Sequence, residues 1–136
     1  MTDERSPVTY AEVVAGVGAA LAAYTHALDD GRTEDVVATY CADGACDIPG
    51  MGTHQGHDEL RAAYTKWAPR RPQRHLVLNT HVSEWSDEEA RATRDVVFLL
   101  KGKDDWGVKL VGRYVDHLHR TDDGWRFHRR TAEFVD

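Results

Sequence analysis

Apolar residues in the first quarter of the chain recur at intervals of three and four. They are Val13, Val17, Leu21, Tyr24 and Leu28. This spacing places the apolar side chains on one helix face, so it predicts one long amphipathic helix from Thr9. The helix should end near Asp29-Asp30-Gly31, where Gly31 suits a C-terminal cap. A stripe of this kind is typical of core packing, and the Tyr24 hydroxyl could also face a cavity, since a buried hydroxyl needs a partner.

Two shorter helices are predicted next, separated by a strand and a loop. Thr33 could cap the first of them, whose apolar face would include Tyr40 and Cys41. Ala42-Asp43-Gly44 should break this helix, and residues 45–48 should form a short strand. Turn-forming residues at 49–56 predict a loop. Apolar spacing then predicts a third helix over residues 57–68.

Beyond residue 68 the periodicity changes to that of strands. The predicted strands are 74–86, 90–101, 106–120 and 125–135. The turns between them are short, so neighbouring strands should be antiparallel. This order of elements predicts an α+β fold, with three N-terminal helices on one face of a mainly antiparallel sheet.

The first of these strands carries polar residues that suit a pocket wall. Strict alternation would put His75, Val77, Asn79 and His81 on one face and Leu76, Leu78, Thr80 and Val82 on the other. His75 and Asn79 would then lie roughly 13 Å apart along the strand. A lone histidine on a strand more often satisfies a hydrogen bond in the core, so the rest of the chain must decide its role.

Length and composition narrow the class of protein. The 136 residues suggest one domain, 1–136, with residues 1–8 as a flexible lead-in. The net charge of −6 and the short basic pairs Arg70-Arg71 and Arg129-Arg130 argue against a nucleic-acid partner. The N-terminus lacks a secretory signal, and no apolar run suggests a membrane span, so we expect a cytoplasmic protein.

The cysteines and histidines raise the question of redox or metal chemistry, but their spacing does not establish either. Cys41 and Cys46 lack CxxC spacing, so we expect reduced thiols, one in a helix and one in a strand. His117 and His119 would share a strand face, and His54 and His57 flank a loop-to-helix junction. The sequence fixes no third ligand for either pair, so we predict no metal site.

Five segments in this order resemble the nuclear transport factor 2-like superfamily, and more closely its SnoaL-like branch. The resemblance runs from about Tyr24 to Arg130. It rests on Ala27-Leu28-Asp29-Asp30-Gly31, Tyr40-Cys41-Ala42-Asp43-Gly44-Ala45, Gly50-Met51-Gly52-Thr53-His54-Gln55-Gly56, Arg74-His75-Leu76-Val77-Leu78-Asn79 and Tyr114-Val115-Asp116-His117-Leu118-His119-Arg120, the last followed by Asp123-Gly124-Trp125-Arg126-Phe127.

Within that branch the segments resemble scytalone dehydratase and hexachlorocyclohexane dehydrochlorinase. The resemblance implies a cone-shaped fold and a cofactor-free lyase with an Asp–His dyad inside the cone. The dyad would map onto Asp29 and His75, although helical phase alone does not choose between Asp29 and Asp30. A second catalytic histidine of the dehydratase aligns with Tyr114, so we do not expect the same substrate.

This assignment makes chemical sense. Imidazole suits a general base at neutral pH, and a carboxylate on its other nitrogen would orient it and stabilise the imidazolium. Tyr114 and Asn79 could hold an oxygen on which charge develops. The substrate-binding wall would include Tyr24, Met51, Tyr64, Trp67 and Phe98, each of which could equally be plain core.

The expected function is therefore a cofactor-independent lyase or isomerase acting on a small, largely apolar molecule. Dehydration, dehydrohalogenation, isomerisation and cyclisation all remain open. The alternative is a non-catalytic binding module, or a small subunit of the kind found in ring-hydroxylating dioxygenases. Apolar Val111 and Val115 among charges on the outer sheet face predict a homodimer or homotrimer.

Overall fold

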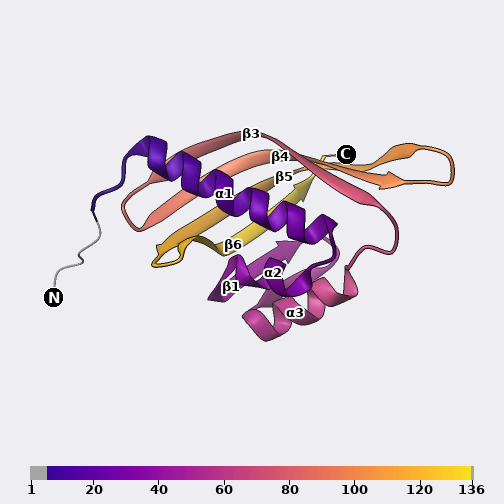
Figure 1. Cartoon of the computed structure of the whole chain (residues 1–136), viewed down its shortest axis with the longest axis horizontal. Coiled ribbons are helices and arrows are strands. Elements are labelled where there is room, and N and C mark those ends of the chain that lie inside the picture. Colours follow the sequence, from indigo (N-terminus) through magenta and orange to yellow (C-terminus); the bar gives the residue numbers. More distant parts are fainter. Residues whose placement is uncertain (1–5, 136) are drawn as a thin grey trace.

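The structure is a computed structural model and describes residues 6–135 (Figure 1). In chain order the elements of this part are α1 (Tyr10–Asp29), α2 (Thr33–Ala38), β1 (Tyr40–Ile48), β2 (Gly52–Gln55), α3 (His57–Lys66), β3 (Gln73–Trp85), β4 (Glu89–Lys101), β5 (Trp106–Thr121) and β6 (Gly124–Phe134). The six strands form one sheet in the order β2-β1-β6-β5-β4-β3. Every neighbouring pair is antiparallel except β1 and β6, which are parallel.

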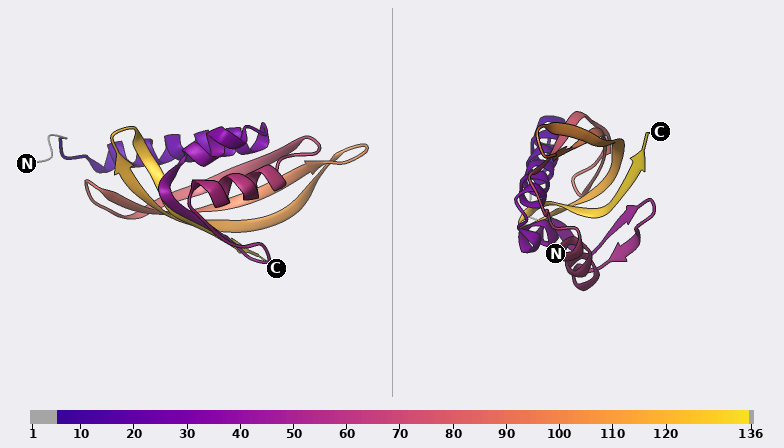
Figure 2. Two further views of the ribbon diagram at one scale, coloured as in Figure 1. Left: turned by 90° about the horizontal axis from the view of Figure 1, so that it is seen from below. Right: turned by 90° about the vertical axis from the view of Figure 1, so that its right-hand side faces the viewer.

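The sheet is strongly curved, and α1 lies along its inner side (Figure 2). The α+β prediction with a mainly antiparallel sheet is confirmed, and β3 to β6 begin and end within one residue of the predicted strands. The helices do not all come first, however. α3 follows β1 and β2, and it packs with α2 beside these two strands at one edge of the sheet (Figure 1).

Both ends of α1 are capped by local sequence. Thr9 and Glu12 form a capping box, in which the Glu12 backbone N–H donates to the Thr9 hydroxyl and the Thr9 N–H donates to the Glu12 carboxylate. At the other end Gly31 adopts a φ of 72°. The Gly31 and Arg32 N–H groups donate to Leu28 O and Ala27 O, as in a Schellman motif. The cap makes Asp29 the last helical residue.

The predicted stripe of α1 is buried and forms the centre of the core. It packs on inward residues of the sheet, among them Val82, Ala92, Leu118 and Phe127. The helix approaches the sheet closely at Gly16, where an added Cβ would lie only 2.4 Å from the Trp125 ring. Burial of this apolar surface at about 25 cal/mol per Å² is the main term that holds the helix on the sheet.

The region between α2 and α3 differs from the sequence prediction. The N-cap of α2 is Arg32, which makes no side-chain capping bond, and Thr33 is already helical. Tyr40 and Cys41 belong to β1 and not to a helix, because β1 pairs with β6 from Tyr40 onwards. The expected loop at 49–56 contains β2, which pairs with β1. Local pattern predicted only residues 45–48 of β1, because the strand that pairs with it from Tyr40, β6, lies far along the chain, and it missed β2.

A bulge in β3 overturns the predicted alternation of its faces. The register with β4 shifts between Leu78 and His81, and Asn79 has a φ of 57°. Asparagine tolerates this left-handed conformation better than most residues. The bulge reverses the direction of later side chains, so Val82 is buried on the same inner side as His75.

Three further predictions concerned the N-terminal lead-in, membrane-spanning segments and the state of the cysteines. Residues 1–5 of the predicted lead-in lie outside the described residues, whereas Val8 packs on the core and its N–H donates to Asp87. Contrary to the sequence reading, α1 is long and apolar enough to cross a membrane, yet its apolar stripe forms the core. Cys41 and Cys46 are free thiols, as predicted.

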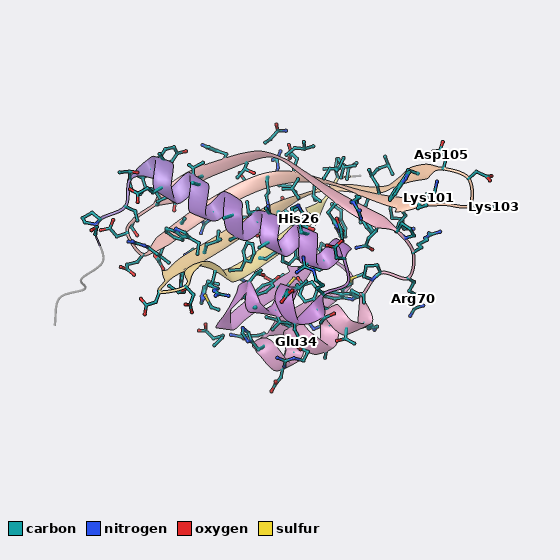
Figure 3. All side chains as sticks on the ribbon, viewed as in Figure 1. His26, Glu34, Arg70, Lys101, Lys103 and Asp105 are labelled. Atoms are coloured by element: carbon teal, nitrogen blue, oxygen red, sulfur yellow. The ribbon has the colours of Figure 1, made fainter. Side chains whose placement is uncertain are left out.

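Several charged side chains lie at the periphery of the molecule. Figure 3 shows Lys101, Lys103 and Asp105 at the β4–β5 turn, Glu34 on α2 and Arg70 ahead of β3. Arg70 and the neighbouring Arg71 are exposed.

Candidate active site

A cavity of about 270 Å³ opens on the inner side of the curved sheet, beside the C-terminal end of α1. Apolar and aromatic side chains make up most of its wall. Five of the six predicted substrate-binding residues line it, namely Tyr24, Met51, Tyr64, Trp67 and Phe98. His75, Gln73 and Tyr114 supply polar groups to the same wall. An apolar cleft with a few convergent polar groups is the usual form of a small-molecule site.

The structure brings Asp29 and His75 together, and His75 is the member of the pair that lines this cavity. Asp29 Oδ1 lies 2.6 Å from His75 Nδ1, and Asp29 Oδ2 accepts the His75 backbone N–H at 2.7 Å. Gln73 Nε2 donates to Asp29 Oδ1 at 3.2 Å. The Asp29 and His75 side chains are only 5% and 13% exposed. A carboxylate only accepts hydrogen bonds, so Nδ1 donates to Asp29, and in the neutral imidazole the free lone pair is then on Nε2.

Tertiary position distinguishes Asp29 from Asp30. Asp29 ends α1 where the helix meets the first residues of β3, and its carboxylate contacts Gln73 and His75. Asp30 is the C-cap residue and is exposed, and its carboxylate faces Arg32 at 3.6 Å. The helix cap therefore decides which of the two neighbouring acids reaches the histidine.

Two aromatic residues complete the surroundings of His75. The Phe98 ring stacks on the imidazole with centroids 4.3 Å apart and planes 14° apart, which holds the ring in place. Tyr114 lines the cavity from β5, and burial raises the pKa of its hydroxyl, so this group is a proton donor at neutral pH. Among residues 6–135 we find no hydrogen-bond partner for the Tyr114 hydroxyl.

The other two tyrosines of the wall, Tyr24 and Tyr64, form hydrogen bonds with each other and, through Tyr64, with Tyr40. Tyr64 Oη lies 2.7 Å from both Tyr24 Oη and Tyr40 Oη, and it donates to Cys46 Sγ at 3.6 Å. Burial raises the pKa of Tyr24, Tyr40 and Tyr64. The Tyr24 hydroxyl thus has its partner in Tyr64, and its aromatic ring forms the cavity wall.

Asn79 is the predicted site residue that the structure places elsewhere. It lies at the β3 bulge, is exposed, and its side-chain amide donates to Asp95 at 2.8 Å. The expectation that Asn79 shares a pocket wall with His75 was wrong, because the bulge breaks the alternation on which it depended.

A buried charge cluster behind the cavity was missed by the sequence reading. Arg130 donates two hydrogen bonds to Asp116, at 2.8 and 2.9 Å, and Arg94 Nε lies 3.5 Å from the same carboxylate. All three residues are at most 2% exposed. The Arg130 guanidinium also lies 4.3 Å from the Tyr114 ring centroid. The available signal was that these three charged residues occupy positions of β4, β5 and β6 whose side chains face inward.

The histidine pair near α3 makes hydrogen bonds to backbone carbonyls. His54 Nε2 lies 3.0 Å from Met51 O, and His57 Nε2 lies 3.0 Å from Tyr40 O. Each ring thus fixes the loop or strand beside it. His117 and His119 lie on the opposite face of the sheet, away from the cavity.

Comparison with known proteins places this fold in a class. Three solved structures from Novosphingobium aromaticivorans are similar. A candidate aromatic ring hydroxylase is 25% identical, with a TM-score of 0.84 and coverage of 95% of this chain and 93% of that one. A candidate scytalone dehydratase is 19% identical, with a TM-score of 0.82 over 93% and 86%. An NTF2-like protein with a cystatin-like fold is 21% identical, with a TM-score of 0.82 over 93% and 84%.

These likenesses define an NTF2-like, cystatin-like α+β fold. The sequence profile of the family described as SnoaL-like domain matches residues 9–131, so the chain belongs to the SnoaL-like family. This agrees with the resemblance found in the sequence. No curated protein sequence matches the chain.

Proposed function

We propose that this protein is a lyase or isomerase that removes a proton from a small, largely apolar substrate by Asp–His general base catalysis. The contact between Asp29 Oδ1 and His75 Nδ1 beside the cavity carries the proposal. Family membership supports it, because SnoaL-like proteins include dehydratases and isomerases. The cavity volume of about 270 Å³ suits a small ligand.

The proposal gives each group of the dyad a role. His75 Nε2 would accept the substrate proton, because Nδ1 is already bonded to Asp29. The Asp29 carboxylate would stabilise the imidazolium that forms and keep Nδ1 as the protonated nitrogen. Backbone and Gln73 hydrogen bonds hold that carboxylate in place. The proposed proton transfer therefore uses groups of the chain itself and needs no metal or organic cofactor.

Tyr114, which also lines the cavity, would support the same step. Its hydroxyl is protonated and without a partner in the described residues, so it can donate to a substrate carbonyl or leaving-group oxygen. Dehydration, dehydrohalogenation, double-bond isomerisation and cyclisation can each include a proton removal of this kind. The particular reaction depends on the group that leaves or moves.

A non-catalytic module of the same fold is the second candidate. Its support is the similarity to the candidate aromatic ring hydroxylase, together with the range of functions that one fold can host. The paired Asp29 and His75 at an open cavity favour the enzyme, since a pure binding wall has no need for an oriented base.

The proposal is tested by substitutions in the dyad. His75→Gln and Asp29→Asn should each lower kcat by about 10²–10⁴ on a substrate found by screening lyase and isomerase reactions. Asp30→Asn is the matched control, because Asp30 is the neighbouring acid and faces Arg32, and it should retain most activity. Circular dichroism and ligand binding should show folded protein throughout. Near-normal activity in both His75→Gln and Asp29→Asn would refute the proposal.

A further inference from the structure

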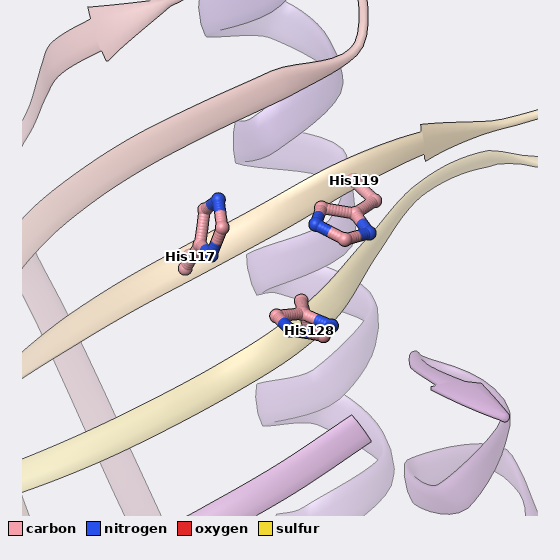
Figure 4. Close-up of side chains that lie close together, drawn as sticks. All are labelled: His117, His119 and His128. Carbon is pink, nitrogen blue, oxygen red and sulfur yellow. The ribbon is translucent and has the colours of Figure 1, made fainter. Parts of the chain in front are cut away.

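Three histidines gather on the outer face of the sheet, with α1 behind the strands that carry them (Figure 4). His117 and His119 belong to β5, and His128 belongs to β6. One ligand atom from each lies within 4.8 Å of the other two. The residues between them in β5 and β6, such as Leu118 and Phe127, point into the core. The three imidazoles are thus separated from the cavity by the sheet.

A bulge in β6 brings His128 into this group. On β5, His117 pairs with Arg129 but Leu118 pairs with Phe127, so His128 is the extra residue between them. A bulge of this kind redirects a side chain, which is why the sequence did not supply a third ligand. The His128 and His119 rings stack with centroids 4.2 Å apart, and the His117 ring meets both edge-on, at 5.4 and 5.0 Å.

Glu89 adds a carboxylate from β4 to the same group. Its Oε1 lies 3.5 Å from His117 Nε2 and 3.3 Å from His119 Nε2. His128 Nδ1 is buried and has no hydrogen-bond partner among the described residues. A buried ring nitrogen without a partner is uncommon in native proteins, and a metal ion or water would satisfy it.

We propose that His117, His119, His128 and Glu89 form a binding site for one divalent transition-metal ion of the Zn²⁺ class. In a tetrahedral site with Zn–N bonds of about 2.0–2.1 Å, ligand atoms lie roughly 3.3–3.4 Å apart. The distances from Glu89 to His117 and His119 fit this spacing, and small side-chain rotations would bring the third imidazole in. Imidazole ligands favour Zn²⁺, Ni²⁺ or Cu²⁺ over Mg²⁺ and Ca²⁺.

A metal ion bound at this site would stabilise the fold and would take no part in the chemistry of the Asp29–His75 dyad. Its ligands come from β4, β5 and β6, so the ion would cross-link three neighbouring strands on the face opposite Asp29 and His75. The proposal is therefore independent of the proposed catalytic function. Because metal binds the folded arrangement of ligands, it should raise the unfolding temperature.

Calorimetric titration of the metal-free full-length protein with ZnCl₂ tests the site. We expect saturable binding of one Zn²⁺ per chain and a higher thermal midpoint with Zn²⁺. His128→Gln and Glu89→Gln should each weaken binding at least tenfold. His81→Gln is the matched control, because His81 is an exposed histidine on β3 outside the group, and it should bind as the unchanged protein does.

Other outcomes would overturn the proposal. These are no saturable binding, unchanged affinity in both His128→Gln and Glu89→Gln, or an equal loss in His81→Gln. Circular dichroism of each variant confirms that a loss of binding is not a loss of folding. Asp29→Asn should bind Zn²⁺ normally, which separates a failure of this site from a failure of the catalytic proposal.

Discussion

At the residue scale, one buried carboxylate pairs with two buried guanidinium groups. Asp116 is fully buried and contacts both Arg94 and Arg130. Burial lowers the pKa of Arg94 to about 9, so both arginines remain charged at neutral pH. The pKa of Arg130 is raised because the attraction of Asp116 outweighs the opposing effect of burial. Asp116 therefore compensates two positive charges that water cannot reach.

Asp116→Asn should destabilise the protein strongly, because an amide of the same shape leaves both buried guanidiniums without an anionic partner. We expect the free energy of unfolding to fall by about 3–5 kcal/mol, the usual range for breaking a buried pair. Denaturant unfolding followed by circular dichroism measures it. Asp95→Asn is the control, since Asp95 pairs with Arg113 on the solvent side, and it should change stability little. Equal effects of the two substitutions would contradict this account.

At the scale of elements, Asp47 joins three strands at the sheet edge that carries α3. From β1 its carboxylate accepts hydrogen bonds from Thr53 of β2 and from Arg129 of β6, the latter at 2.7 and 2.8 Å. Burial tends to raise the pKa of Asp47, but the hydrogen bonds outweigh it and hold the pKa below its ordinary value. The group thus stabilises the fold in its ionised form.

Asp47→Asn should lower the free energy of unfolding by about 1–2 kcal/mol at neutral pH, as expected for charge-assisted hydrogen bonds that are partly exposed. A lowered folded-state pKa means that this stabilisation is present above the unfolded pKa and is lost as pH falls through the folded value. The difference between the two proteins should therefore shrink below about pH 4. Urea titrations at several pH values measure it.

The matched control for this substitution is Asp43→Asn, on the same strand. Asp43 is exposed, so its substitution should change stability little across the same pH range. If the loss in Asp47→Asn were constant from neutral pH to pH 3, ionisation of Asp47 would not be its cause.

At the scale of the whole molecule, the outer sheet face exposes apolar side chains among charged ones. Val108 and Val111 of β5 are 63% and 41% exposed, beside charged residues such as Arg113. Exposed apolar patches of this kind mark interaction surfaces. We propose that the protein forms a homodimer or homotrimer through this face.

Light scattering coupled to size exclusion should then report two or three chains per particle. Val111→Lys should shift the protein toward the monomer, because an interface buries the added charge at a cost. Val14→Lys is the control, since Val14 is an exposed valine on α1, and it should leave the mass unchanged. A monomeric mass for the unsubstituted protein at micromolar concentration would contradict the proposal.

Local sequence determined the types and most of the boundaries of α1, α3 and β3 to β6, but it missed β2 and the first half of β1. Apolar spacing and the Gly31 cap predicted α1, and alternating segments between short polar turns predicted β3 to β6. These signals are reliable because they depend on neighbours along the chain. The sequence resemblance also indicated the Asp29 and His75 pair, although helical phase left Asp30 as an alternative.

Tertiary structure decided what depends on distant partners. The meeting of α1 with the start of β3 selected Asp29, and pairing with β6 made Tyr40 a strand residue. Register shifts against neighbouring strands placed Asn79 outside the cavity wall and His128 beside His117. A bulge changes which face a side chain occupies without leaving a periodic signal, since one extra residue reverses the alternation. Burial of Asp116 between two arginines likewise follows from packing across three strands, which no single segment encodes.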